Sequence, residues 1–96
     1  MNEQDILNTL QKEKRTLQEK YGLLSIGLFG SYSKGRQGPD SDIDLLVELA
    51  EPRFDDLAGI QIYLENKIGK RIDILRKRKG MNERLLKRIE KSIHYV

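Results

Sequence analysis

Two short polar motifs, each placed where an apolar segment ends or begins, constrain this chain more than any other feature. Gly30-Ser31 follows an apolar run over residues 23–29, and Asp42-Ile43-Asp44 opens an alternating run that continues to Leu49. The ten residues between the motifs, 32–41, include two glycines and a proline, which favour turns. We therefore predict two strands joined by a loop, the first closed by glycine and serine and the second opened by two carboxylates.

Apolar residues recur at helical spacing over residues 5–21, 54–68 and 82–93, which predicts three helices. A shorter apolar run, residues 71–75, contains one acid, Asp73, and predicts a third strand. Helices interleaved with strands favour an α/β fold, here a small mixed three-stranded sheet packed by helices.

Two of the segments between the predicted helices and strands contain residues that predict their local structure. Ser31 is a good N-cap residue, so residues 32–36 are expected to form a short helical turn with free backbone N–H groups over the strand end. Glu51-Pro52-Arg53 is expected to break the second strand.

Composition limits the function classes. A chain of 96 residues suits one domain, residues 1–96, and its net charge of +3 is too small to predict nucleic-acid binding. There is no cysteine, which excludes disulfides and thiolate metal sites. The polar, acidic first residues do not resemble a signal peptide, and no apolar run approaches the roughly 20 residues that span a bilayer. We expect a soluble cytoplasmic protein without a membrane partner.

The acids suggest a cation site. Residues two apart in a strand share a face at roughly 6–7 Å, so Asp42 and Asp44 should project side by side, and Asp73 could join them from a neighbouring strand. Three such carboxylates repel one another unless cations intervene, and oxygen ligands without histidine or cysteine favour Mg²⁺ or Mn²⁺. We therefore predict Asp42, Asp44 and Asp73 as catalytic metal ligands.

The glycine-serine motif and its loop suggest a phosphate site beside these acids. Gly30 lets the backbone approach a phosphate, the Ser31 hydroxyl can donate to its oxygens, and Lys34 and Arg36 add positive charge. Together with Ser41, these four residues are the predicted nucleotide-binding set.

Plainer interpretations remain open for each feature alone. An Asp-x-Asp pair after a Gly-Pro loop is often a solvated edge strand, and Asp73 alone is more often a solvent-facing residue. Tyr32 is expected in the core or at a helix edge, although its position after Ser31 could place it beside a nucleotide. The basic residues around the third strand favour a solvated face over contact with phosphates, RNA or an acidic partner, and His94 is assigned no role. These basic residues are Lys67, Lys70, Arg71, Arg76, Lys77, Arg78 and Lys79.

The combination of motifs resembles the signature of the nucleotidyltransferase superfamily that includes DNA polymerase beta, and the chain length resembles its minimal branch. Gly30-Ser31, ten residues and Asp42-Ile43-Asp44 match literally, and Asp73 stands at the place of the family's third acid. The resemblance covers about residues 25–75 and implies a palm-like fold. It also implies two Mg²⁺ ions on Asp42, Asp44 and Asp73, and the β- and γ-phosphates of a nucleoside triphosphate on Gly30 and Ser31.

Minimal nucleotidyltransferases of this kind resemble the antitoxin half of a toxin–antitoxin pair whose toxin is a small helical protein of the HEPN type (higher eukaryotes and prokaryotes nucleotide-binding). The resemblance implies that the toxin is a ribonuclease, and that this chain silences it by transferring AMP from ATP to a tyrosine near the ribonuclease site within a hetero-oligomer. Two alternatives remain: an antitoxin that blocks the toxin by occlusion alone, and a nucleotidyltransferase that acts on a small molecule or an RNA end. Solvated acids on a structural module form the plainest alternative.

Overall fold

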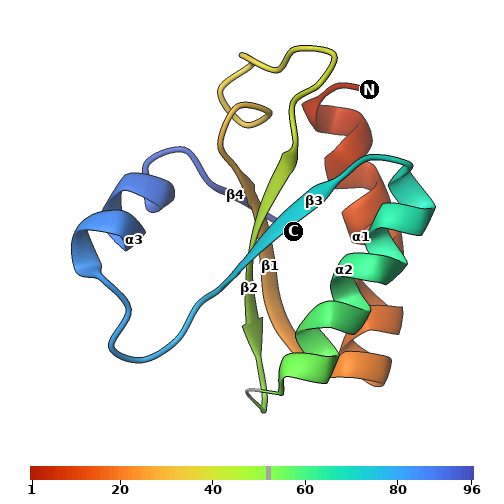
Figure 1. Ribbon diagram of the computed structural model, residues 1–96, viewed down its shortest axis with the longest axis vertical. Helices are drawn as coiled ribbons and strands as arrows, with labels where there is room; N and C mark the ends of the chain where they lie inside the picture. The colour runs from red at the N-terminus through yellow and green to blue at the C-terminus, as the bar shows by residue number, and fades with distance from the viewer. Residues whose placement is uncertain (52) are drawn as a thin grey trace.

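A computed structural model describes residues 1–51 and 53–96 (Figure 1). Along the chain the elements are α1 (Glu3–Tyr21), β1 (Leu23–Phe29), β2 (Ile43–Leu49), α2 (Phe54–Ile68), β3 (Ile72–Arg76), α3 (Glu83–Glu90) and β4 (His94–Tyr95). Pro52, part of the predicted break after the second strand, lies outside the described residues. Among the helices in the described part, none is both long and apolar enough to cross a lipid bilayer.

The sheet is mixed, as the sequence predicts, but it has four strands in the order β3-β2-β1-β4. β1 pairs with β2 and β4 in antiparallel fashion, and β2 pairs with β3 in parallel. The prediction of three strands was therefore wrong by one short edge strand.

The fourth strand explains why the last helix ends before residue 93, the last apolar residue at helical spacing. α3 ends at Glu90, and His94 and Tyr95 pair with Leu28 and Gly27 of β1. A Cβ atom at residue 27 would stand 2.6 Å from Cδ1 of Ile93, so the glycine is what lets this segment approach the sheet. The helical spacing of Ile93 is thus coincidental, and its side chain packs on the strand.

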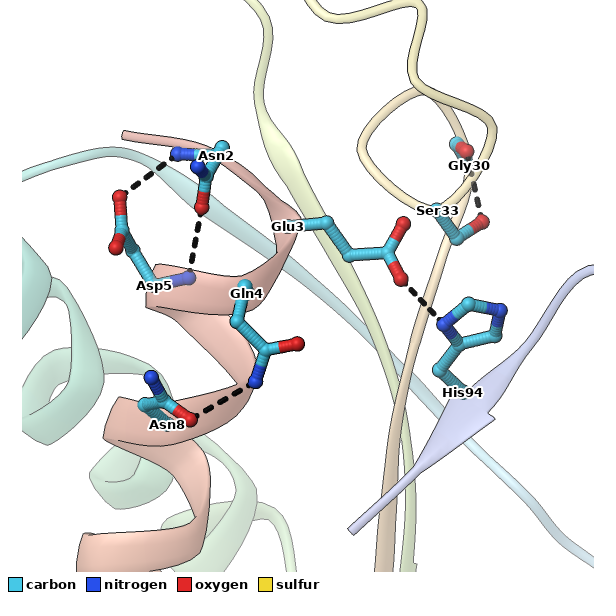
Figure 2. A network of polar contacts seen from close by, with 8 residues as sticks. All are labelled: Asn2, Glu3, Gln4, Asp5, Asn8, Gly30, Ser33 and His94. Carbon is cyan, nitrogen blue, oxygen red and sulfur yellow. Dashed lines mark hydrogen bonds and ion pairs between the residues drawn. The ribbon is translucent and has the colours of Figure 1, made fainter.

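Side chains and glycine mark the ends of α1. The Asn2 side chain accepts a hydrogen bond from the Asp5 N–H (2.9 Å), and the Asp5 carboxylate accepts one from the Asn2 N–H (3.1 Å), which forms a capping box (Figure 2). Gly22 closes the helix in the left-handed region at φ 69°. Glu3, at the start of the same helix, also forms an ion pair with His94 of β4 (Figure 2).

The two faces of the sheet differ in their cover. α1 and α2 lie together on one side, and α3 lies on the other (Figure 1). The covered face supplies the main core: Ile43, Leu45 and Val47 of β2 are fully buried there. The helices contribute Ile6, Leu10 and Leu17 from α1 and Ile60 and Leu64 from α2. We call the opposite side, which carries α3, the open face.

Candidate functional site

Strand pairing brings two of the predicted acids side by side on the open face. Alternate residues of a strand point to opposite faces, and Ile43 and Leu45 point into the core, so Asp44 faces away from it. Asp44 pairs in register with Asp73 of β3, and paired residues share a face. Asp42 lies one residue before β2 begins, on the same side by alternation.

The three acids share an electrostatic field centred on Asp44. The pKa of the Asp44 carboxyl is raised above its usual value, first by burial and then by the negative charges of Asp73 and Asp42. The ionised form of Asp44 is thus disfavoured where it stands. A cation at this place would remove that conflict.

The three carboxylates are near one another, but they do not converge on a single point. In residues 1–51 and 53–96 no group of three or more His, Cys, Asp or Glu side chains is placed to hold a metal ion. Asp42 instead forms an ion pair with Arg71, whose Nε lies 3.3 Å from Asp42 Oδ1. The donor set still fits a hard divalent cation such as Mg²⁺, because Asp42, Asp44 and Asp73 supply oxygen and no nitrogen or sulfur.

Arg71 is the residue of this site that the sequence analysis placed only in a basic stretch. The Ile43 N–H donates to the Arg71 carbonyl at 3.0 Å, so the ladder between β2 and β3 places Arg71 beside Asp42. The signal that could have found it is the parallel pairing of the two acidic segments: once Asp44 is set against Asp73, the residues two before each also become neighbours.

Gly30 lies directly against the acidic cluster. Its φ is +77°, and a Cβ atom added there would stand 3.0 Å from Cγ of Asp44 and closer still to a carboxylate oxygen. Glycine is therefore required at this position for two reasons: the backbone is left-handed, and a side chain would occupy the space of the Asp44 carboxylate. The strand register that pairs Phe29 with Asp44 creates this contact.

The helical turn expected over residues 32–36 is present but begins earlier, at Gly30. The Lys34 N–H donates to the Gly30 carbonyl (3.2 Å) and the Arg36 N–H to the Ser31 carbonyl (2.8 Å). Across the described part of the chain, the N–H groups of residues 31–33 donate to no protein acceptor. Ser31 makes no capping bond there, and Ser33 Oγ instead donates to the Gly30 carbonyl at 3.0 Å (Figure 2). Free N–H groups in a first turn suit an anion such as phosphate.

The structure distributes the rest of the predicted nucleotide-binding set around this turn. Lys34 is exposed and lines a depression of about 200 Å³ between Gly30 and α3, and Arg36 is exposed further along the loop. Ser41 closes the loop: its Oγ accepts from the Gly38 N–H at 2.8 Å. Ser41 also lines a depression of about 400 Å³ with Asp42 and Arg71.

Tyr32, which could have bordered a nucleotide, is instead a core residue. Its side chain is 1% exposed and belongs to the buried cluster between the sheet and the two long helices. The turn therefore presents backbone groups and flanking cations to the open face and inserts its one aromatic ring into the core.

Comparisons with known proteins assign the family. Residues 10–96 match the family model described as the nucleotidyltransferase domain. A Methanocaldococcus jannaschii protein named "Putative protein adenylyltransferase" is 39% identical over 95 residues, which cover 96% of this chain and 95% of that one.

Two solved structures share the fold. One, a "putative minimal nucleotidyltransferase", has a TM-score of 0.79 and 30% identity, covering 98% of this chain and 95% of that one. The other, a toxin–antitoxin with AMP-PNP, has a TM-score of 0.69 and 25% identity, covering 99% of this chain and 72% of that one. With the acidic pair, the glycine-serine turn and the mixed sheet in place, the chain belongs to the nucleotidyltransferase domain family and is a nucleotidyltransferase of its minimal type.

Proposed function

We propose that this nucleotidyltransferase is an antitoxin that transfers AMP from ATP to a tyrosine hydroxyl of a HEPN-type toxin, with two Mg²⁺ ions. The observation that carries the proposal is the position of Asp44. It is flanked by Asp73 and Asp42 on the open face and lies against Gly30, at the start of a turn with free N–H groups.

The comparisons support the acceptor class and the partner class separately. The M. jannaschii relative bears the name of a protein adenylyltransferase, which supports a protein acceptor. The structural neighbour solved with AMP-PNP is a toxin–antitoxin, which supports a toxin partner and an adenine nucleotide. The HEPN type of the toxin and the tyrosine rest on the resemblance of the motif to minimal nucleotidyltransferases.

The reaction joins the acceptor oxygen to the α-phosphorus of ATP and breaks the bond from that phosphorus to the bridging oxygen of pyrophosphate. The tyrosine hydroxyl releases its proton to solvent water, and pyrophosphate leaves. The N–H groups of residues 31–33 and the Ser31 hydroxyl bind the β- and γ-phosphates, and Lys34 and Arg36 offset their charge. Asp42, Asp44 and Asp73 would hold the magnesium ions, which would supply charge compensation for the transferred phosphoryl group.

The shape of the molecule supports an acceptor from another protein. The acids lie on the face that α1 and α2 leave uncovered, where, within residues 1–51 and 53–96, the eight-residue α3 is the one helix that packs. The described elements therefore leave room on that face for an acceptor. A second protein can therefore bring a hydroxyl to the acids without displacing the main core.

The test mixes this chain with a HEPN-type toxin, ATP and Mg²⁺, and measures the intact mass of both proteins. We expect one or more AMP adducts on the toxin, located on tyrosine by peptide fragmentation, and loss of toxin ribonuclease activity. The double variant Asp42→Asn/Asp44→Asn, checked for folding by circular dichroism, should add no AMP.

Each remaining outcome contradicts a part of the proposal. Toxin inhibition by the double variant without any adduct would establish occlusion in place of transfer. Transfer to a small molecule or an RNA end in the absence of the toxin would change the acceptor. Transfer that persists in the double variant would show that these carboxylates do not hold the metals.

A further inference from the structure

The outer edge of β3 has free main-chain groups. β3 is the last strand of the sheet, so only one of its sides is paired. The Arg71 carbonyl accepts from Ile43 and the Lys77 N–H donates to Val47, at 3.0 and 2.7 Å. In a parallel ladder alternate residues bond to the same neighbour, so Ile72, Ile74 and Arg76 direct their N–H and C=O groups outward.

α2 covers only the first of these outward residues. The Ile72 N–H donates to the Glu65 carboxylate (3.0 Å), and the Gln61 side-chain amide donates to the Ile72 carbonyl (2.9 Å). For Ile74 and Arg76, no such partner exists among residues 1–51 and 53–96. The free edge therefore begins where the cover from α2 stops.

A groove with an apolar floor lies beside this free edge. It has a volume of about 340 Å³, and its apolar side chains come from α2, β3, α3 and the segment that leads into α3. These are Leu57, Leu75, Met81 and Leu85, and the last of them is 40% exposed. Arg76 and Arg78 line the same groove.

The charged residues that line the groove, Arg76 and Arg78, are both positive. Residues 76–79 are all lysine or arginine, and no acid occurs between residues 74 and 82. A second copy of this chain would bring an equally basic edge, and like charges facing each other oppose that pairing. A nucleic acid has no row of backbone N–H groups at strand spacing that could pair with the outward carbonyls of Ile74 and Arg76.

We propose that the outer edge of β3 binds an extended, acidic segment of a protein partner as an added strand. The partner's backbone pairs with Ile74 and Arg76, its alternate apolar side chains enter the groove, and its carboxylates face residues 76–79. This docking surface lies at the edge of the sheet and uses none of the residues assigned to the nucleotide or the metals.

The test uses a fluorescein-labelled ten-residue peptide of alternating valine and glutamate, with a valine–lysine peptide of equal length as control. Fluorescence polarisation should show saturable binding of the acidic peptide and at least about tenfold weaker binding of the basic one. Amide hydrogen exchange, measured by NMR, should slow at Ile74 and Arg76 when the acidic peptide is bound.

Two substitutions at one position separate backbone pairing from charge. Arg76→Thr removes the charge and keeps the N–H, whereas Arg76→Pro removes both. The Arg76 N–H points away from β2, so proline breaks no bond within the sheet. We expect about threefold weaker peptide binding for the threonine variant and a further loss of about tenfold for the proline variant. Arg78→Glu, in the loop, provides a charge test that leaves the strand intact.

Several results would overturn the proposal. The acidic peptide could fail to bind or bind without saturation, the two Arg76 variants could bind it equally, or amide protection could be confined to other elements. A wild-type dimer that Arg76→Pro dissociates would assign the edge to a second copy of the chain. Binding of a single-stranded RNA in competition with the peptide, and stronger than it, would assign the basic segment to nucleic acid.

Discussion

The two faces of the sheet divide stability from chemistry along a single strand. In β2, Ile43, Leu45 and Val47 point toward α1 and α2 and are fully buried, whereas Asp44 and Glu48 alternate with them on the open face. The cover differs accordingly, because α1 and α2 place five buried residues against the sheet and α3 places only Ile89. Because successive side chains of a strand point to opposite faces, β2 contributes to both the core and the candidate site.

Placing an acid on the open face also works against the stability of the fold. Asp44 is held where burial and its acidic neighbours disfavour its charge. The well-packed face must hold the fold together while the open face keeps this charge available. Substitutions on the two faces should therefore separate activity from stability.

The largest effect is expected for Asp44→Asn. The substitution removes the central carboxylate, so we expect nucleotidyl transfer to fall by about 10³-fold or more, measured by radiolabel transfer from ATP. Glu48→Gln, on the same strand and face, is the matched control and should keep activity near that of the wild type. Equal losses in both variants would mean that the open face needs its charge in general and not Asp44 in particular.

Asp44→Asn should not be less stable than the wild type, and the difference in the free energy of unfolding between the two proteins should depend on pH. A carboxyl group whose pKa is higher in the folded than in the unfolded state makes the fold less stable as pH rises above the ordinary value of 3.8. Asp44→Asn removes that effect. Its free energy of unfolding should therefore equal or slightly exceed the wild-type value at pH 7, and the difference should shrink toward pH 3. The increment is small because the carboxylate remains partly in water.

Ile60→Ala and Ile89→Ala compare the two faces directly. Ile60 of α2 is fully buried in the main core, so its truncation should lower the free energy of unfolding by about 3 kcal/mol. Ile89 is the one buried residue of α3, so we expect a smaller global loss, about 1–2 kcal/mol, with faster amide exchange confined to α3. Denaturant titration and hydrogen exchange measure both effects. Equal global losses would mean that α3 is as much a part of the core as α2.

Gly30→Ala tests the contact between the turn and the acids. A left-handed φ costs about 1–2 kcal/mol for alanine, and the new Cβ would also push the Asp44 carboxylate from its place. We expect transfer to fall by about 100-fold, in line with the effect of a 1 Å misplacement.

Gly35→Ala is the control for strain alone. Gly35 has a φ of +68°, and a Cβ atom there would meet nothing within 4 Å. Its substitution should lower stability by a similar amount and leave transfer within about threefold of the wild type. Loss of transfer in both variants would make the shape of the whole loop, and not the space beside Asp44, the cause.

The sequence predicted the helices and strands in which apolar residues recur at a regular spacing. The three helices, the three longer strands and the end of α1 at Gly22 were confirmed, because each rests on local spacing or a local cap. β4 could not be predicted, since two residues carry no period and the strand exists only through its pairing with Gly27 and Leu28. For the same reason α3 was predicted to run past Glu90.

The candidate site was predictable in part. Asp42 and Asp44 were proposed from their spacing and Asp73 from its place in the third strand and the family resemblance, and the parallel register of β2 and β3 confirms that Asp44 and Asp73 are neighbours. The ion pair between Arg71 and Asp42 depends on that register, and the burial of Tyr32 depends on how the turn lies over the core. Neither follows from local sequence.

Arg71→Ala should have the smallest effect on stability and addresses the cation that faces the acids. The Arg71 side chain is 83% exposed and that of Asp42 is 34% exposed, so their ion pair should contribute no more than about 0.5 kcal/mol to folding. In the proposed site Arg71 and a metal ion would compete for the Asp42 carboxylate, so the Mg²⁺ concentration for half-maximal transfer should fall by about threefold in the variant. Lys70→Ala removes a neighbouring cation that has no ion pair with Asp42, and it should shift the midpoint less. An equal shift in both variants would mean that the open face responds to net charge alone, whereas a higher midpoint in Arg71→Ala would mean that Arg71 helps to bind the nucleotide.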